Sequence, residues 1–370
     1  MKKITLLFVM LFAFQFSYAQ SETSLVEKTI QNYINGSSYN NRTQLKSAFA
    51  EDATLYLKGK NNQMRIVSPE TYTGWFKNAA AGTFNGRIGR VVSIDVQGDI
   101  ATAKAEILFT TRGTKYVDLF LLNKKDDGWK IISKTASGGK TIKRGNKIVF
   151  FVSNSHFYGD TKISTGNSYS EIVNAYDEFV KAGYTVDFVS PKGGAISLAY
   201  INTSDPIGKK YLYDEEFMYA LKYTKTPKEV NAKDYKAVYY VGGGSAMFDV
   251  PVNKEIQRIA MEVYEKNNGV ISAVCHGTAG IVNLKTSNGA YLVKGKTVNG
   301  YPDVYENKSL PRFKTFPFLI TKTIEERGGK FVFSARNSEH VEVDGRLVTG
   351  QNYISSKAVA LKIIELIKSK

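Results

Sequence analysis

The spacing of apolar residues divides the chain into two parts. In residues 22–135 the apolar spacing is at first helical. It predicts one helix in SLVEKTIQNYINGS, which should end at Asn35-Gly36. It predicts a second helix in SPETYTGWFKNA, with Ser68 as N-cap and Pro69 in the first turn. The period then becomes two in RVVSIDVQ, IATAKAEILFTT, KYVDLFLLNK and WKIISKTA, which turn-forming residues separate. This part, residues 20–135, is predicted to be an α+β domain, a cone of helices and an antiparallel meander.

A different pattern follows. The segment ASGGKTIKRGN, residues 136–146, mixes glycines with basic residues and has no apolar period, which is typical of a linker. From Lys147, apolar runs such as IVFFVS, YTVDFVS, AVYYVGG and GVISAV alternate with helical stretches. Strands that are apolar almost throughout predict a parallel sheet covered on both faces. Residues 147–370 should therefore form a doubly wound α/β domain, a flavodoxin-like parallel sheet.

The chain begins with the features of an export signal. Lys2 and Lys3 precede an apolar run too short to cross a membrane, and Ala19 provides a small residue for cleavage. Gln20 follows where a lipid-anchored protein would have cysteine. We therefore expect residues 1–19 to be a signal peptide and the mature protein to be periplasmic or secreted, with no membrane span.

The charge of the chain indicates which partners it can bind, and its cysteine content indicates what can stabilise its fold. Without Lys2 and Lys3, 48 basic residues stand against 34 acidic ones, so the net charge falls from +16 to +14. Because the basic residues are scattered, they indicate a solvated surface, and no nucleic-acid partner is expected. A single cysteine cannot form an intramolecular disulfide, so hydrophobic burial must stabilise the fold.

The single cysteine, Cys275, lies in the stretch AVCHGTAG at the predicted carboxyl end of a strand. In doubly wound sheets this edge carries the functional sites. Small residues at positions 273 and 277 favour a sharp strand-to-helix turn of the kind that presents a nucleophile. A buried structural cysteine is the competing interpretation. For a nucleophile at a helix N-terminus we expect a lowered thiol pKa.

Two family resemblances follow from longer stretches. "AFAEDATLYL" and "DGWKIISK", with the order of elements, make residues 20–135 similar to the nuclear-transport-factor-2-like superfamily, in its lumazine-binding or SnoaL-like branch. Residues 147–370 resemble the ThiJ/PfpI family of the class I glutamine-amidotransferase-like superfamily, nearest its chaperone-like and glyoxalase III branch. The stretches that carry this resemblance are "TGNSYSE", "AGYTVDFVSPKGG", "VGGGSAMFDVP", "AVCHGTAG", "LVKGKTVNGYPDVYE" and "DGRLVTGQNYISS".

The second resemblance implies roles for individual residues. Cys275 matches the family nucleophile, His276 the adjacent histidine and Glu306 the acid that orients it. Glu171 matches the acidic residue beside the thiol and must be protonated, or carefully angled, to favour a thiolate. The glycines of VGGGSAMFD could stabilise an oxyanion through their backbone N–H groups. The candidates are Gly243, Gly244 and the His276 amide.

The resemblance implies an exported cysteine-dependent enzyme that converts a small 2-oxoaldehyde into a hydroxy acid without a cofactor. The alternatives are a chaperone-like or redox-sensing binding protein, and an amidase or peptidase. A metal site is not expected, because the three histidines lie far apart in the sequence. Both families imply a homodimer. Departures from the family pattern, at Gly244, Asn167 or Ser168, Ala175 and Asn337, concern the pocket wall and so leave the substrate open.

Overall fold

The structure is a computed structural model, and it describes residues 21–59, 61, 63–77 and 79–369. The predicted signal peptide lies outside the described residues. Among the helices of the described part, none combines the length and the apolar character that crossing a membrane requires.

The N-terminal domain is a six-stranded sheet with the strand order β2-β1-β6-β5-β4-β3, accompanied by three helices. The four runs of period two form strands, as predicted. Strands β1 and β2 were not predicted, because polar residues interrupt their apolar positions. The elements are α1 (Glu22–Ser38), α2 (Arg42–Ser47), β1 (Phe49–Lys58), β2 (Met64–Val67), α3 (Pro69–Gly74), β3 (Arg87–Gln97), β4 (Ile100–Phe109), β5 (Thr114–Lys125) and β6 (Gly128–Lys140).

The two helix boundaries predicted from sequence have different outcomes. Ser68 caps α3 as predicted, since its hydroxyl accepts a hydrogen bond from the Thr71 N–H at 3.2 Å. Helix α1, however, continues beyond Asn35-Gly36 to Ser38. Gly36 packs against the backbone of Leu45 in α2, where a side chain would not fit. The glycine therefore serves helix packing and does not end the helix.

The segment predicted as a linker is largely structured. Strand β6 runs through Lys140, and the Thr141 N–H then donates to the Gly113 carbonyl at 3.0 Å. Lys143 reaches Glu106 of β4 at 2.8 Å. Residues 136–370 thus form a compact unit that also includes residues 84–93 and 105–118 of the sheet. Contacts with residues far away in the sequence thus order part of a segment whose glycine-rich composition is typical of a linker.

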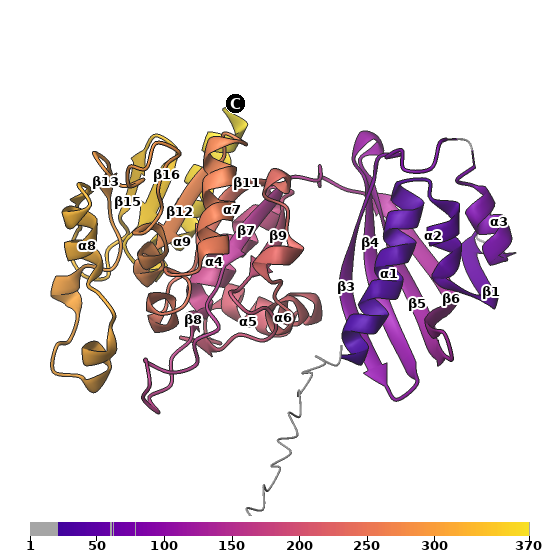
Figure 1. Cartoon of the computed structure of the whole chain (residues 1–370), viewed down its shortest axis with the longest axis horizontal. Helices are drawn as coiled ribbons and strands as arrows, with labels where there is room; N and C mark the ends of the chain where they lie inside the picture. Colours follow the sequence, from indigo (N-terminus) through magenta and orange to yellow (C-terminus); the bar gives the residue numbers. More distant parts are fainter. Residues whose placement is uncertain (1–20, 60, 62, 78, 370) are drawn as a thin grey trace, which may run out of the picture. The chain divides into compact units, whose positions relative to one another are not determined.

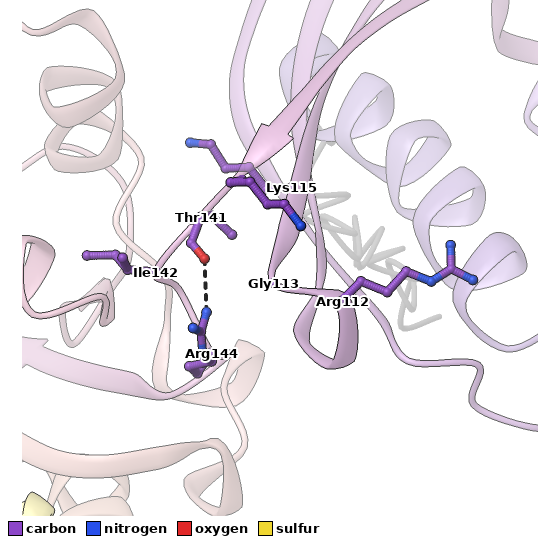
Figure 2. Close-up of a pocket in the computed structure, with 7 residues that line it drawn as sticks. Arg112, Gly113, Lys115, Thr141, Ile142 and Arg144 are labelled. Atoms are coloured by element: carbon purple, nitrogen blue, oxygen red, sulfur yellow. Dashed lines mark hydrogen bonds between the residues drawn. The ribbon is translucent and has the colours of Figure 1, made fainter.

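An open hollow of about 690 Å³ lies beside this segment (Figure 2). Basic side chains contribute most of its polar lining, and no carboxylate is among them. The residues that line it are Arg112, Gly113, Lys115, Lys140, Thr141, Ile142 and Arg144. The hollow therefore has a basic lining.

The C-terminal domain has the predicted doubly wound α/β architecture (Figure 1). Its sheet has the order β15-β16-β12-β11-β7-β9, parallel except for the edge strand β15. In chain order the parallel strands are arranged 2-1-3-4-5, the flavodoxin-like order. The strands are β7 (Lys147–Phe151), β9 (Thr185–Val189), β11 (Tyr235–Tyr240), β12 (Val270–Val274), β15 (Val341–Asp344) and β16 (Leu347–Gly350).

Helices cover both faces of this sheet. Along β7, Ile148 and Phe150 pack into one apolar cluster, whereas Val149 and Phe151 pack into the other. This alternation explains why the strand is apolar throughout. The first cluster contains α4 (Tyr169–Lys181), α5 (Pro206–Leu212), α6 (Glu215–Lys222) and α9 (Ser356–Lys368), and the second contains α7 (Lys254–Glu265) and α8 (Ile320–Glu326). Short strand pairs, β8 (Asn167–Ser168) with β10 (Leu198–Ala199) and β13 (Thr297–Val298) with β14 (Lys330–Phe331), lie outside the main sheet.

Candidate active site

Cys275 lies at the sharp turn predicted for it. It directly follows β12 and has a φ of 56°, in the left-handed region that non-glycine residues rarely adopt. Gly277 packs against the carbonyl oxygen of Tyr240, where a Cβ would not fit. The strained backbone and the required small residue together form the strand-to-helix elbow that exposes a nucleophile.

The predicted lowering of the Cys275 pKa is wrong. Burial raises the pKa of the thiol well above its usual value, and the Glu171 carboxyl raises it further, although the His276 backbone N–H acts in the opposite direction. The helix that starts at Cys275 is a short 3-10 helix, Cys275–Ile281. Its dipole does not outweigh the loss of solvent around the sulfur. The resting side chain is therefore a thiol.

His276 and Glu306 lie together beside this thiol. The Cys275 Sγ is 3.5 Å from His276 Nδ1, and His276 Nε2 is 2.6 Å from a Glu306 carboxylate oxygen. Both side chains are mostly buried, with 14% and 11% of their surfaces exposed. The carboxylate fixes the ring and would stabilise its protonated form. Such an array can remove the thiol proton when sulfur attacks a substrate.

Glu171 completes the group from the first turn of α4. It is 2% exposed, and one of its carboxyl oxygens accepts a hydrogen bond from the Gly242 N–H at 2.9 Å. Burial raises the pKa of Glu171 to about 8, even though hydrogen bonds from Gly242, Ser168 and Cys275 act to lower it. Glu171 is therefore mostly a neutral carboxylic acid at pH 7, one of the two states predicted for a carboxyl beside the thiol.

The glycine loop meets the thiol through a residue that was not predicted. A Cβ on Gly242 would lie 2.5 Å from the Glu171 carboxyl and 3.0 Å from the Cys275 Cβ. The predicted Gly243 has a φ of 97° and packs against Gly166 and the Ser168 backbone N. Gly242 is thus the loop residue in contact with the reactive group.

The other predicted loop residue, Gly244, packs against a phenol. Its Cα faces the Tyr158 hydroxyl and the Thr165 hydroxyl, which leave no room for a side chain. Among the predicted oxyanion donors, the His276 N–H is the one whose hydrogen bond lowers the pKa of the Cys275 thiol. For Gly243 and Gly244 the contacts are with Gly166, Ser168, Tyr158 and Thr165.

Aromatic residues that were not predicted pack beside His276. Tyr301 stacks on the His276 ring at a centroid distance of 4.7 Å, and Phe316 meets that ring edge-on at 5.8 Å. Tyr158 lies 6.1 Å from Phe316. Tyr301 belongs to the quoted stretch NGYPDVYE, but periodicity alone assigns no function to a tyrosine. Only the fold shows that Tyr301 and Phe316 contact the imidazole.

Two parts of the chain match known protein families. A family described as "Putative lumazine-binding" matches residues 21–137, and the DJ-1/PfpI family matches residues 163–366. The chain belongs to the DJ-1/PfpI family. Both resemblances drawn from the sequence are thereby confirmed.

Relatives within the DJ-1/PfpI family include named enzymes. "Glutathione-independent glyoxalase HSP31" of Saccharomyces cerevisiae is 34% identical over 230 residues, which cover 58% of this chain and 94% of that protein. "Glyoxalase 3" of Candida albicans is 32% identical over 225 residues, covering 57% of this chain and 93% of that protein. The crystal structure of glyoxalase III from Candida albicans has a TM-score of 0.55 at 27% identity and covers 61% of this chain and 99% of that one.

The C-terminal domain contains a second histidine–glutamate pair. In it, His340 contacts Glu342 at 2.7 Å, and its Nδ1 is 3.0 Å from the Ser334 hydroxyl. Within the described residues, no group of three histidine, cysteine, aspartate or glutamate side chains is placed to hold a metal ion.

Proposed function

We propose that this protein converts a small 2-oxoaldehyde into the corresponding 2-hydroxy acid without glutathione, with Cys275 as the nucleophile. The observation that carries the proposal is the Cys275–His276–Glu306 array, with neutral Glu171 beside the sulfur. Relatives at 31–34% identity that carry the name glutathione-independent glyoxalase support the reaction class.

In the first step the sulfur of Cys275 attacks the aldehyde carbon. The S–C bond forms, the thiol proton moves to His276 Nδ1, and the aldehyde oxygen becomes the hydroxyl of a hemithioacetal after it takes up a proton. Glu306 stabilises the imidazolium while His276 holds the thiol proton. The raised pKa of the thiol makes this general-base step necessary, because little thiolate exists beforehand.

The remaining steps move one proton and add one water. The hydrogen on the former aldehyde carbon leaves as a proton and the neighbouring carbonyl carbon gains one, which gives a 2-hydroxyacyl thioester. Water then hydrolyses this thioester, releases the 2-hydroxy acid and restores the thiol. The sum is one 2-oxoaldehyde plus one water to one 2-hydroxy acid, so no external oxidant or reductant is required.

The redox-sensor alternative fits the site less well. Oxidation by peroxide follows thiolate character and exposure. Burial raises the pKa of Cys275, and the neighbouring carboxyl raises it further. Both effects protect the thiol from oxidation but allow a substrate-coupled proton transfer.

The test is lactate formation from methylglyoxal in the absence of glutathione. We expect activity in the wild type and a loss of at least about 10³-fold in Cys275→Ser and His276→Asn. His340→Asn is the matched control, since His340 pairs with Glu342 at 2.7 Å in the same domain but has no thiol beside it. Equal activity of wild type and Cys275→Ser would refute the proposal.

We also propose that the protein is exported after removal of residues 1–19. The basic start, the short apolar run and Ala19 support it. Expression of the full chain in a bacterial host, followed by N-terminal sequencing of periplasmic material, should give Gln20 as the first residue. Retention of Met1 in a cytosolic product would contradict this.

A further inference from the structure

Arg336 lies at the edge of the reactive site and is held there by the tyrosine that covers the catalytic imidazole. Its guanidinium donates a hydrogen bond to the Tyr301 hydroxyl at 2.8 Å. Tyr301 stacks on His276, with an angle of 20° between the rings. The Tyr301 N–H also donates to the Cys275 carbonyl at 3.2 Å. Tyr301 thus connects Arg336 to the His276 ring through its side chain and to the Cys275 backbone through its own N–H.

A second contact orients the guanidinium. Its central carbon lies 5.8 Å from the centroid of the Tyr305 ring, within the range of a cation–π interaction. The Tyr305 hydroxyl in turn donates to the Ser334 carbonyl at 2.7 Å, which fixes the ring. The cation is therefore positioned before any ligand arrives.

The positive charge of Arg336 is not neutralised at this edge. Arg336 is exposed, and within the described part of the chain no carboxylate forms an ion pair with it. Arg258 offers a contrast, because Glu255 and Glu262 pair with it at 3.0 and 3.2 Å. Of the five N–H donors of an arginine, most remain free here for an external acceptor.

The acidic groups of the site do not compete for this cation. The Glu306 carboxylate is engaged by His276 at 2.6 Å. Glu171 is mostly uncharged at pH 7, since burial raises its pKa to about 8. A negatively charged ligand at this edge of the site therefore meets a guanidinium that has no ion-pair partner among the described residues, while the Glu306 carboxylate is held by His276.

We propose that Arg336 binds an anionic group of the substrate, a carboxylate or a phosphate, and so selects negatively charged carbonyl compounds over neutral ones. A planar guanidinium suits the paired oxygens of either group. The substrate class rests on the proposed function, whereas anion selection at the thiol does not.

Alkylation of Cys275 tests this selection without any turnover. Iodoacetate and iodoacetamide react alike: sulfur displaces iodide, an S–CH₂ bond forms and the thiol proton is released. They differ in charge, because iodoacetate carries a carboxylate and iodoacetamide carries a neutral amide. Because Cys275 is the single cysteine of the chain, the rate reports on this site alone. We expect the iodoacetate-to-iodoacetamide rate ratio to fall about tenfold in Arg336→Gln, with Arg336→Lys in between.

Two further variants separate anion binding from simple positioning. Arg258→Gln is the matched control and should keep the wild-type ratio. Tyr301→Phe removes the hydroxyl that holds Arg336 but keeps the ring on His276. If Arg336 acted only through Tyr301 on the imidazole, its loss would slow both reagents equally. An unchanged ratio in a folded Arg336→Gln protein would overturn the inference.

Turnover measured on the same variants keeps the two proposals apart. A wild type that fails to convert methylglyoxal, yet shows the Arg336-dependent ratio, would refute the proposed reaction and support anion selection. A wild type that converts methylglyoxal, with a ratio independent of Arg336, would do the reverse.

Discussion

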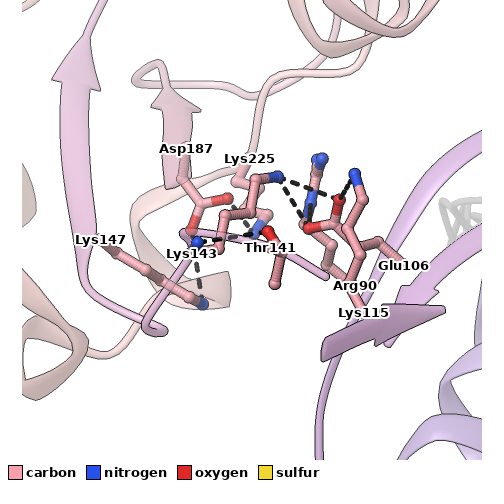
Figure 3. Close-up of polar contacts among 8 residues, drawn as sticks. All are labelled: Arg90, Glu106, Lys115, Thr141, Lys143, Lys147, Asp187 and Lys225. Atoms are coloured by element: carbon pink, nitrogen blue, oxygen red, sulfur yellow. Dashed lines mark hydrogen bonds and ion pairs between the residues drawn. The ribbon is translucent and has the colours of Figure 1, made fainter. Parts of the chain in front are cut away.

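Glu106 and Glu171 are both buried, with 5% and 2% of their surfaces exposed, but their neighbours differ. Three cations surround Glu106 of the N-terminal sheet: Lys143 at 2.8 Å, Lys115 at 3.2 Å and Arg90 at 3.3 Å (Figure 3). Burial alone would raise its pKa, but Arg90, Lys143 and Lys115 together lower the pKa of Glu106 to about 2. This glutamate is ionised.

Glu171 has no such partners. The groups that hydrogen-bond to it are the Gly242 N–H and the Ser168 and Cys275 side chains, none of them a cation, so burial dominates and raises its pKa to about 8. Burial disfavours the charged form in both places, and the neighbours decide whether the charge persists. One glutamate therefore joins the segment after β6 to the sheet, and the other remains neutral beside the Cys275 thiol.

The largest effect is expected from Glu106→Gln. It leaves the cations of Arg90 and Lys143 in a buried place without their counter-charge, so unfolding at pH 7 should become easier by about 3–5 kcal/mol. The wild-type contribution is fully present above pH 4.5 and is lost as pH falls towards about 2, the pKa of Glu106 in the fold. Urea unfolding at several pH values measures both the loss of stability at pH 7 and its dependence on pH.

The matched control for this variant is Glu70→Gln. Glu70 is exposed, with 65% of its side-chain surface accessible, and pairs with Lys46 at 2.8 Å. Because solvent screens this pair, its removal should leave the unfolding midpoint unchanged. Equal midpoint shifts in the two variants would show that burial of Glu106 has no special consequence.

Glu171→Gln should change stability in the opposite direction. A raised pKa means that the stabilisation from the neutral carboxyl is present below about pH 4.5 and is lost as pH rises through about 8. Glutamine keeps the neutral form at every pH. The variant should therefore match the wild type near pH 4.5 and exceed it by about 3 kcal/mol at pH 7. A pH-independent difference between the two proteins would contradict the neutral carboxyl.

Glu306→Gln extends the comparison to a glutamate with a histidine partner. An amide fits the same space, so stability should change little, but turnover of methylglyoxal should fall about 10²-fold because His276 loses the group that stabilises its protonated form. Glu342→Gln is the control, since Glu342 contacts His340 Nε2 at 2.7 Å, nearly the 2.6 Å of the reactive pair. Unchanged turnover in Glu306→Gln would remove Glu306 from the proposed mechanism.

The smallest effect concerns Lys143. Burial and the nearby Arg90 lower the pKa of Lys143, so its charge is costly once Glu106 is gone. Lys143→Met should destabilise the wild type but restore about 1–2 kcal/mol to Glu106→Gln. A double-mutant cycle by urea unfolding would measure this coupling, and additive effects would show that the pair does not interact.

Sequence reasoning was most successful where a single residue carries a local requirement. Cys275, flanked by small residues after an apolar strand, predicted the elbow that its φ of 56° shows. The parallel sheet followed from strands apolar on both faces. Composition did not show that β6 extends to Lys140 or that Lys143 pairs with Glu106, because that pair joins residues 37 positions apart.

The electrostatics of the site were the least accessible to sequence. The pKa of Cys275 depends on burial and on a carboxyl contributed by α4, about 100 residues earlier in the chain, and neither is visible in AVCHGTAG. Gly242, Tyr301 and Arg336 likewise gain their significance from contacts that only the folded chain creates. Motif position predicted residues that the fold brings together, Cys275, His276, Glu306 and Glu171, but it did not predict the raised pKa of the thiol.

The most direct test of this account is the protonation state of the two buried glutamates. Proteins labelled with ¹³C at the glutamate carboxyls, as wild type, Glu106→Gln and Glu171→Gln, can be titrated by NMR from about pH 3 to about pH 9. The signal absent from Glu171→Gln should titrate near pH 8, and the signal absent from Glu106→Gln should remain that of a carboxylate throughout. A Glu171 signal that titrates near 4.5, like an exposed glutamate, would contradict the neutral acid beside Cys275.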